Sequence, residues 1–350
     1  MTAPALDVER LRGLDEDALD AALREFANAH GAQALPALGA LAADGARGLK
    51  RAAKRALYRL AQRGVAAPPR PAPRPVVESG PERATRAWLS GIDGSGSRAA
   101  WVLFERGLGG THLCSLIVND TVGIVDAAGG DITKKRLESE LEALRASQKL
   151  PWVETDPARA LALVAEAQAL HRATGTAPPA AFARWRRLFE HASVPAPAPP
   201  PAPADPALVE RGAELLELPE TAGWFLDPEA VQADAVDLLA ARESRLVVSD
   251  QIKAERQTAI VDRVVERELD AEARRRWARR LDEMAWIFEA TERSELGALA
   301  HAAAWALADP ASDPRRQPFA RGLAQRALEL AGEVASGRIS AADVSRKPGA

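Results

Sequence analysis

The chain contains only one cysteine, Cys114, among its 350 residues. One cysteine cannot form an internal disulfide, and a zinc site built on thiolates needs several. The first residues show neither the basic flank nor the apolar run of a secretory signal. No stretch approaches the roughly 20 apolar residues that a bilayer-spanning helix needs. These absences predict a cytoplasmic protein that does not enter the membrane.

The chain also lacks an excess of charge of one sign. Its 46 Lys and Arg against 49 Asp and Glu give a net charge of −3 at pH 7. Such a balance produces no global field that would attract nucleic acid or a membrane surface. Apolar residues make up 47% and charged residues 27%, which is typical of a globular protein with room for two or three cores.

Strand-forming residues are scarce except between about residues 85 and 127, while the rest of the chain is rich in Ala, Leu, Arg and Glu, which favour helices. Within that window, four strand-like runs are separated by DGSG (93–96), GLGG (107–110) and an Asn119-Asp120 turn. This pattern predicts an antiparallel β-meander. The expected fold class is therefore mainly α with a small α+β domain: an N-terminal helical hairpin, a central meander covered by helices, and a C-terminal helical bundle.

Two proline-rich stretches, Ala66–Val77 and Val194–Pro206, interrupt the chain. Their composition favours extended polyproline II, which acts as a semi-rigid spacer, although a PxxP ligand for an aromatic groove is an alternative. The stretches predict a division into a helical module (1–65), a linker (66–77), an α+β domain (78–192), a second linker (193–206), a helical domain (207–338) and a tail (339–350).

Helical spacing and capping residues predict the individual helices. The N-terminal module is expected to hold helices at 14–29, 34–43 and 49–63. In the middle segment, a helix at 132–147 follows the strands, and helices at 157–173 and 178–190 are expected to cover one face of the sheet. The C-terminal domain is expected to contain helices at 207–217, 228–242, 250–268, 271–290, 293–307 and 316–334.

The helices at 34–43 and 49–63 resemble a HEAT repeat over residues 32–65. The matching residues are Leu35, Pro36, Leu38, Leu41, Asp44, Lys50, Arg51, Ala53, Ala56, Leu57 and Leu60. HEAT units stack into solenoids that bind partners on a concave face, and about three are needed for stability. The resemblance therefore implies a partner-binding surface and no chemistry, and a single repeat with one flanking helix does not support a long solenoid.

The glycines of Gly91-Ile-Asp-Gly-Ser-Gly96-Ser97-Arg98 have the spacing of a phosphate-binding P-loop. However, Ser97 stands where the phosphate-binding Lys belongs, and Arg98 where the Mg²⁺-binding Ser or Thr belongs. A strand-like run follows instead of the helix whose N-terminus would hold phosphate. We expect a hairpin turn here, and the sequence predicts no cofactor.

Catalytic and metal-binding patterns are also missing. The five histidines are scattered, and His112 and Cys114 share one face of a strand but are too few for a zinc site. No GxSxG elbow is present. Carboxylate pairs such as Asp282 with Glu283 are expected to form ion pairs with nearby arginines on exposed helices. No catalytic or metal-binding residue is predicted.

Basic residues give the strongest remaining signal. Between residues 46 and 75 there are nine Lys and Arg and no acid. Seven of them are expected to form one broad helical face that binds phosphate backbones or an acidic protein surface: Arg47, Lys50, Arg51, Lys54, Arg55, Arg59 and Arg63. The alternative is a solvated face offset by the acidic helix at 14–29. A second basic run, 274–280, surrounds Trp277, whose spacing with Leu281 and Met284 predicts a core residue.

Three functions remain open at this level. The leading hypothesis is a non-enzymatic interaction or adaptor protein with a protein partner. The second is nucleic-acid or ribonucleoprotein binding through the basic face, with affinity that falls steeply as salt rises. The third is an enzyme with an unrecognised site in the central α+β domain, which requires a pocket with converging polar groups. The sequence does not indicate an oligomeric state.

Overall fold

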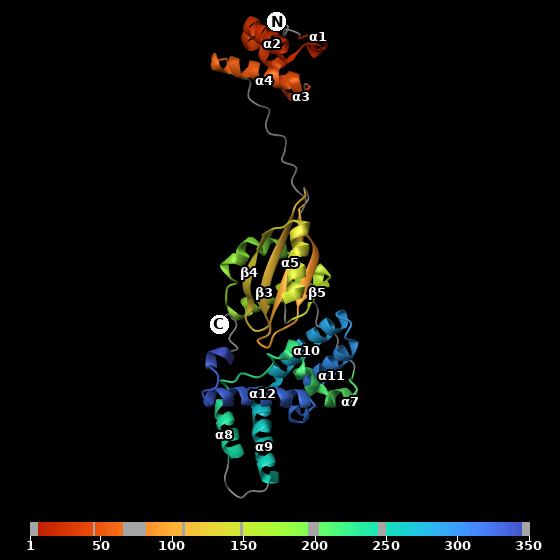
Figure 1. Cartoon of the computed structure of the whole chain (residues 1–350), viewed down its shortest axis with the longest axis vertical. Coiled ribbons are helices and arrows are strands. Elements are labelled where there is room, and N and C mark those ends of the chain that lie inside the picture. Colours follow the sequence, from red (N-terminus) through yellow and green to blue (C-terminus); the bar gives the residue numbers. More distant parts are fainter. Residues whose placement is uncertain are drawn as a thin grey trace. The chain divides into compact units, whose positions relative to one another are not determined.

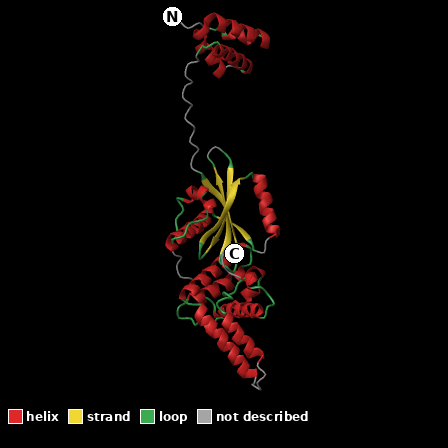
Figure 2. Cartoon of the chain, turned by 90° about the vertical axis from the view of Figure 1, so that its left-hand side faces the viewer, coloured by secondary structure: helices red, strands yellow, loops and turns green. Residues whose placement is uncertain are grey.

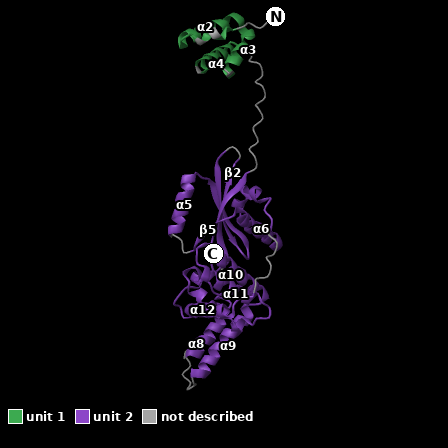
Figure 3. Ribbon diagram, turned by 90° about the vertical axis from the view of Figure 1, so that its right-hand side faces the viewer, with its two compact units in different colours: residues 1–78 green, residues 79–350 purple. Residues whose placement is uncertain are grey.

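The computed structural model describes residues 6–44, 46–65, 82–106, 109–147, 150–194, 203–243 and 250–344, and its elements are labelled in Figure 1. The chain divides into two compact units, Met1–Glu78 and Ser79–Ala350 (Figure 3). The predicted linker at 66–77 lies outside the described residues, as do 195–202 of the second predicted linker and 345–350 of the tail. The predicted domain boundaries therefore stay predictions.

The first unit consists of helices, and the three expected ones are confirmed. It contains α1 (Val8–Arg12), α2 (Glu16–His30), the 3-10 turn η1 (Gly31–Ala34), α3 (Leu35–Asp44) and α4 (Arg47–Gln62). Asp15 begins α2 because its carboxylate accepts a hydrogen bond from the N–H of Ala18 at 2.8 Å. Buried Leu and Ala side chains from α2, α3 and α4 form one small core.

The second unit begins with a five-stranded antiparallel sheet in the order β4-β3-β2-β1-β5. Its strands are β1 (Arg83–Ser90), β2 (Ser97–Glu105), β3 (Thr111–Asn119), β4 (Gly123–Asp131) and β5 (Trp152–Thr155). The first four form the predicted meander, and the fold class is confirmed. The fifth strand, which pairs with β1, was not predicted, because four residues are too few to show an alternating pattern.

Helices cover both faces of the sheet (Figure 2). On one face, α5 (Lys134–Ser147) contributes Leu137 and Leu141 to a cluster with Trp88. On the other, α6 (Pro157–Thr174) and two 3-10 turns, η2 (Ala180–Arg184) and η3 (Arg186–Phe189), pack against β1–β4. The expected cover is confirmed, but the helix expected at 178–190 is wrong. Its aromatic side chains recur every three to four residues, a spacing that also fits consecutive 3-10 turns.

The C-terminal part of the second unit is a helical bundle. Its elements are α7 (Pro206–Glu210), η4 (Gly212–Glu217), η5 (Pro219–Thr221), α8 (Gln232–Glu243), α9 (Asp250–Glu268), α10 (Ala271–Ala290), α11 (Ser294–Ala308), η6 (Pro314–Arg316), α12 (Pro318–Ala335) and η7 (Ala341–Val344). Trp224, Trp277 and Phe319 meet at its centre, with ring centroids 5.5 to 6.3 Å apart. Trp277 is 5% exposed, which confirms it as a core residue.

Two expected C-terminal helices need correction. The segment 207–217 is a short α-helix followed by a 3-10 turn, and Gly212, the first residue of that turn, lies close to Phe319. The helix expected at 228–242 begins only at Gln232, because the Asp227 carboxylate accepts a hydrogen bond from Glu229 N–H within a separate turn. None of the helices in the described ranges is long and apolar enough to cross a membrane.

The sheet and the bundle pack directly on each other within the second unit. The indole N–H of Trp224 donates to the carbonyl of Ile92 at 3.1 Å, and Ile92 N–H points at the sulfur of Met284 at 3.4 Å. Both bundle residues therefore reach the turn between β1 and β2, which positions α10 beside the end of the sheet.

Candidate functional site

The P-loop-like segment is a hairpin turn between β1 and β2, as expected. The Asp93 carboxylate organises it by accepting hydrogen bonds from the backbone N–H groups of Ser95 and Ser97 at 2.8 and 2.9 Å. The amide of Asn119, at the end of β3, donates to the Ser95 carbonyl at 3.0 Å. The turn after β1 and the turn after β3 are therefore joined.

Arg280 of α10 binds both of these turns. Its guanidinium donates to the two carboxylate oxygens of Asp120 at 2.6 and 2.8 Å, and to the carbonyls of Gly94 and Ser95 at 3.2 Å each. The same guanidinium lies 4.6 Å from the Trp277 ring centroid, and its side chain is only 6% exposed. Arg280 thus holds the end of the sheet against the bundle.

Gly96 allows this close approach. Its backbone is left-handed, with φ of 87°, and an added Cβ would lie 2.1 Å from a carboxylate oxygen of Asp120 and 2.3 Å from Arg280 Nη2. A glycine is required there for both reasons. The glycine spacing that resembles a P-loop is therefore explained by contact with an ion pair within the protein.

A second, partly buried ion-pair network lies beside the first. Arg98 of β2, whose side chain is 3% exposed, donates to Glu283 of α10 at 2.6 Å, and Arg159 of α6 donates to the same oxygen at 2.9 Å. Burial alone would raise the pKa of the Glu283 carboxyl, but the charges and hydrogen bonds of Arg98 and Arg159 outweigh it and lower that pKa. Glu283 is therefore ionised at neutral pH.

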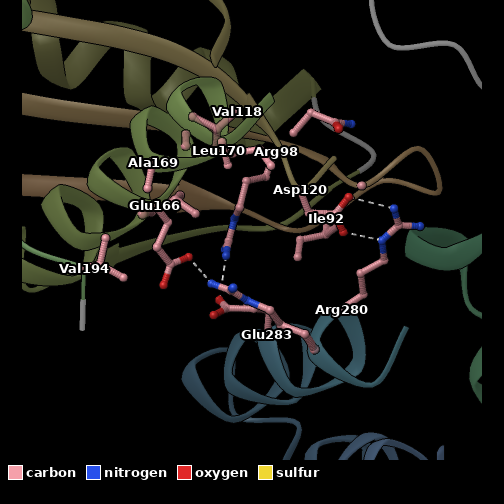
Figure 4. A pocket seen from close by; sticks show the side chains of 16 residues that line it. Ile92, Arg98, Val118, Asp120, Glu166, Ala169, Leu170, Val194, Arg280 and Glu283 are labelled. Carbon is pink, nitrogen blue, oxygen red and sulfur yellow. Dashed lines mark hydrogen bonds and ion pairs between the residues drawn. The ribbon is translucent and has the colours of Figure 1, made fainter. Parts of the chain in front are cut away.

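A cavity of about 600 Å³ opens between these elements (Figure 4). It is lined by α6, by the ends of the strands and by α10, through Ile92, Gly96, Arg98, Val118, Asn119, Asp120, Leu163, Glu166, Ala167, Ala169, Leu170, Ala173, Val194, Arg279, Arg280 and Glu283. Arg279 and Glu166 form a further ion pair across it. Its size is that of a small-molecule site, and it combines an apolar wall with charged side chains.

The predicted basic face lies on α4, but some of its residues form ion pairs with acidic residues of α2. Arg55 contacts Asp20 and Glu16 of α2 at 2.8 and 3.2 Å, and Arg59 contacts Asp20 at 3.1 Å. Partial burial tends to raise the pKa of Asp20, yet its bonds to the two arginines dominate and lower that pKa. These two cations are therefore offset by the acidic helix.

The remaining basic residues differ in their surroundings. Arg63 bonds the Asn28 side chain, and Lys50 is half-buried. Arg51 and Lys54 are exposed, and no acidic side chain in the described part of the chain forms an ion pair with either. The side chain of Arg47 lies outside the described residues.

One residue of this face was missed from the sequence. Tyr58, the chain's single tyrosine, lies one turn after Lys54 on the same side of α4 and is 66% exposed. A helix interior normally turns an aromatic side chain toward the core, so the cations that precede Tyr58 at i−7 and i−4 on the same side were the available signal.

Other sequence candidates carry no site. Burial raises the pKa of the Cys114 thiol to about 12, so it is not a thiolate nucleophile at neutral pH. His112, two residues earlier in β3, pairs with Asp131 at 2.7 Å. Within the described ranges, no group of three or more His, Cys, Asp or Glu side chains is placed to hold a metal ion.

The ion-pair network around the cavity, which joins α10 to β2 and α6, was also not predicted from the sequence. The expected pairing of Glu283 with arginine is found, but its expected place on an exposed helix is wrong, because α10 packs on two sides and turns Glu283 toward Arg98. Arg280 follows the core residue Trp277 by three positions, and that spacing was the one signal that it shares a buried face.

Comparison with family models, with curated proteins and with solved structures finds no match to this chain. The function is therefore inferred from the two sites themselves.

Proposed function

We propose that this chain is a non-enzymatic interaction protein whose first unit binds an acidic surface of a protein partner. The contact is the α4 face, which we define as Arg51, Lys54 and Tyr58. The observation that carries the proposal is Tyr58, which is 66% exposed and follows, one and two turns along α4, two cations that have no acidic ion-pair partner among the described residues. Exposed Tyr and Arg are the residue types that most often dominate protein interfaces.

Charge supports an acidic protein partner over nucleic acid. Arg55 and Arg59, which would extend the basic face, are paired with acids of α2. Asp15, Glu16 and Asp17 at the start of α2 add further negative charge to the same unit. Phosphate backbones bind through many unpaired cations in a row, whereas a compact acidic patch needs only a few. The resemblance to a HEAT repeat is consistent with partner binding and remains part of the proposal.

Quantitative affinity capture from native lysate tests this function with the full chain as bait. Tyr58→Ala and the double variant Arg51→Glu/Lys54→Glu are each compared with the original chain. The control is Lys253→Glu/Arg256→Glu, which reverses two basic residues at the same spacing on α9. We expect Tyr58→Ala to weaken the affinity for one protein partner by about 30-fold, since an interface hot spot contributes about 2 kcal/mol. The control should retain it.

Two results would contradict the proposal. Partners that are captured equally by all four baits would show that the α4 face is not the contact. Capture that disappears after nuclease treatment, and weakens steeply with salt, would instead establish nucleic-acid binding through the basic residues.

A further inference from the structure

The cavity of the second unit has one apolar wall. Leu163, Ala167, Leu170 and Ala173 follow each other at helical spacing on α6 and line it on one side. Val118 of β3 adds to this wall. An aliphatic group of a ligand would lose its contact with water there, which is favourable in proportion to the apolar area covered.

The charged side chains that line the cavity are balanced, with Arg98, Arg279 and Arg280 against Asp120, Glu166 and Glu283, but the ion-pair network that they belong to holds one further arginine, Arg159. The Arg280–Asp120 pair is bidentate and neutral as a unit. The other ion-paired groups around the cavity are the cations Arg98, Arg159 and Arg279 and the carboxylates Glu166 and Glu283. Arg159 does not line the cavity, but it shares Glu283 with Arg98, so this network of three arginines and two carboxylates has one net positive charge.

Among these arginines, Arg279 has N–H donors that can bind a ligand. Arg98 is fully enclosed and already bonds Glu283 and the carbonyl of Ser90. The Arg279 side chain is 58% exposed, and within the described residues Glu166 is its one ion-pair partner. A guanidinium has five N–H donors in a planar fork, so one edge can hold Glu166 while another binds a second carboxylate.

We propose that this cavity binds a small amphipathic monoanion, a carboxylate attached to an aliphatic body. The carboxylate contacts Arg279 and neutralises the excess positive charge. The aliphatic body lies along the α6 wall formed by Leu163, Ala167 and Leu170. In Figure 4, Ala169 and Leu170 of α6 lie on one side of the cavity and Arg280 and Glu283 of α10 on the other. The site lies in the second unit and is independent of the α4 face.

Titration calorimetry on the full chain tests the site with decanoate as the probe, at concentrations below micelle formation. Decanol has the same body without charge, and decylamine has the opposite charge. We expect decanoate to bind once per chain and about tenfold more tightly than decanol, since one charge-assisted contact contributes roughly that factor. Decylamine should bind more weakly than decanol.

Three variants locate the site. Arg279→Gln should remove the preference for decanoate over decanol, because the carboxylate loses its cation. Ala169→Trp, which places a large side chain in the cavity, should weaken both ligands. Arg276→Gln, whose ion-pair partner is the exposed Glu272, should change neither affinity. Arg279 and Arg276 are both surface-accessible, and tryptophan fluorescence of each variant verifies that the second unit is folded.

Several outcomes would overturn the proposal. Decanoate that fails to bind the original chain removes the site. Equal binding of decanoate and decanol, unchanged in Arg279→Gln, shows an apolar cavity without anion recognition. Decanoate binding that survives Ala169→Trp shows that the ligand occupies a different place.

Discussion

Helices α4 and α10 share a sequence signature and use it in opposite ways. Both carry a run of basic residues with one aromatic residue among them. On α4 the aromatic, Tyr58, is 66% exposed, whereas on α10 the aromatic, Trp277, is 5% exposed. Arg280, in the basic run of α10, is buried as well. A basic run therefore does not by itself identify a binding surface.

The difference comes from the number of sides on which each helix is packed. Helix α4 buries one apolar stripe against α2 and α3, so its cations remain at the surface. Helix α10 buries one side in the bundle core and presents another to the turns of the sheet. An arginine can be buried there because a carboxylate and two backbone carbonyls compensate its charge. Packing on a second side is what separates α10 from α4.

Removing each aromatic side chain in turn should produce the largest difference in stability between the two helices. Trp277→Ala leaves a cavity beside Trp224 and Phe319, and we expect it to lower the free energy of unfolding of the second unit by about 4 kcal/mol. Urea unfolding followed by tryptophan fluorescence measures this unit alone, because all eight tryptophans lie between residues 88 and 305.

The matched change in the first unit is Tyr58→Ala. In this variant, the free energy of opening of the first unit, measured by hydrogen exchange of α4 amides, should change by less than about 0.5 kcal/mol, as for other exposed positions. A large loss of stability in Tyr58→Ala, or a small one in Trp277→Ala, would contradict the contrast between the two helices.

The half-buried Glu283 carboxylate of α10 should give the next largest change in the free energy of unfolding. Glu283→Gln removes the charge that Arg98 and Arg159 share, and we expect a loss of about 2 kcal/mol at pH 7. Because the pKa of Glu283 is lowered in the folded state, its ionised form stabilises the protein above the ordinary value of 4.5. That contribution disappears as the pH falls through the lowered pKa.

Urea unfolding of the second unit at pH 7 and at pH 3 tests this expectation. The difference between the original chain and Glu283→Gln should shrink on acidification. A difference that is equal at both pH values would show that Glu283 acts through packing and not through its charge.

The exposed ion pairs of the first unit should give the smallest effect. Asp20→Asn removes the carboxylate that contacts Arg55 and Arg59, and we expect a loss of about 0.5 kcal/mol at pH 7. The pKa of Asp20 is lowered in the folded state, so this contribution is also lost as the pH falls through the lowered value. Hydrogen exchange of α2 amides with and without 1 M salt measures it, and screening should reduce the effect further.

Local sequence patterns predicted most of the fold. The helices at 250–268 and 271–290 have the predicted bounds, and the four-strand meander lies where its turn residues placed it. The boundaries that failed, such as the start of α8 and the turns at 180–189, depend on which of two local hydrogen-bond patterns packs better. Packing of that kind is decided by distant residues.

The two sites were predictable to different degrees. The basic residues of α4 are neighbours on one helix, so their shared face follows from helical spacing. The cavity network joins Arg98, Arg159 and Glu283, which come from a strand, a helix and a second helix far along the chain. No local pattern connects such residues, and Glu283 therefore resembled an ordinary surface carboxylate.

The contacts of Arg280 also bear on the order in which the chain can fold during synthesis. Arg280 and Asp120 are 160 residues apart, and Ile92 and Met284 are 192 apart. At about 5–20 residues per second, the turns of the sheet leave the ribosome on the order of ten seconds before α10 exists. Until then the Asp120 carboxylate and the carbonyls of Gly94 and Ser95 are solvated by water. The second unit is therefore expected to fold slowly and late, because its closing contacts have high sequence separation.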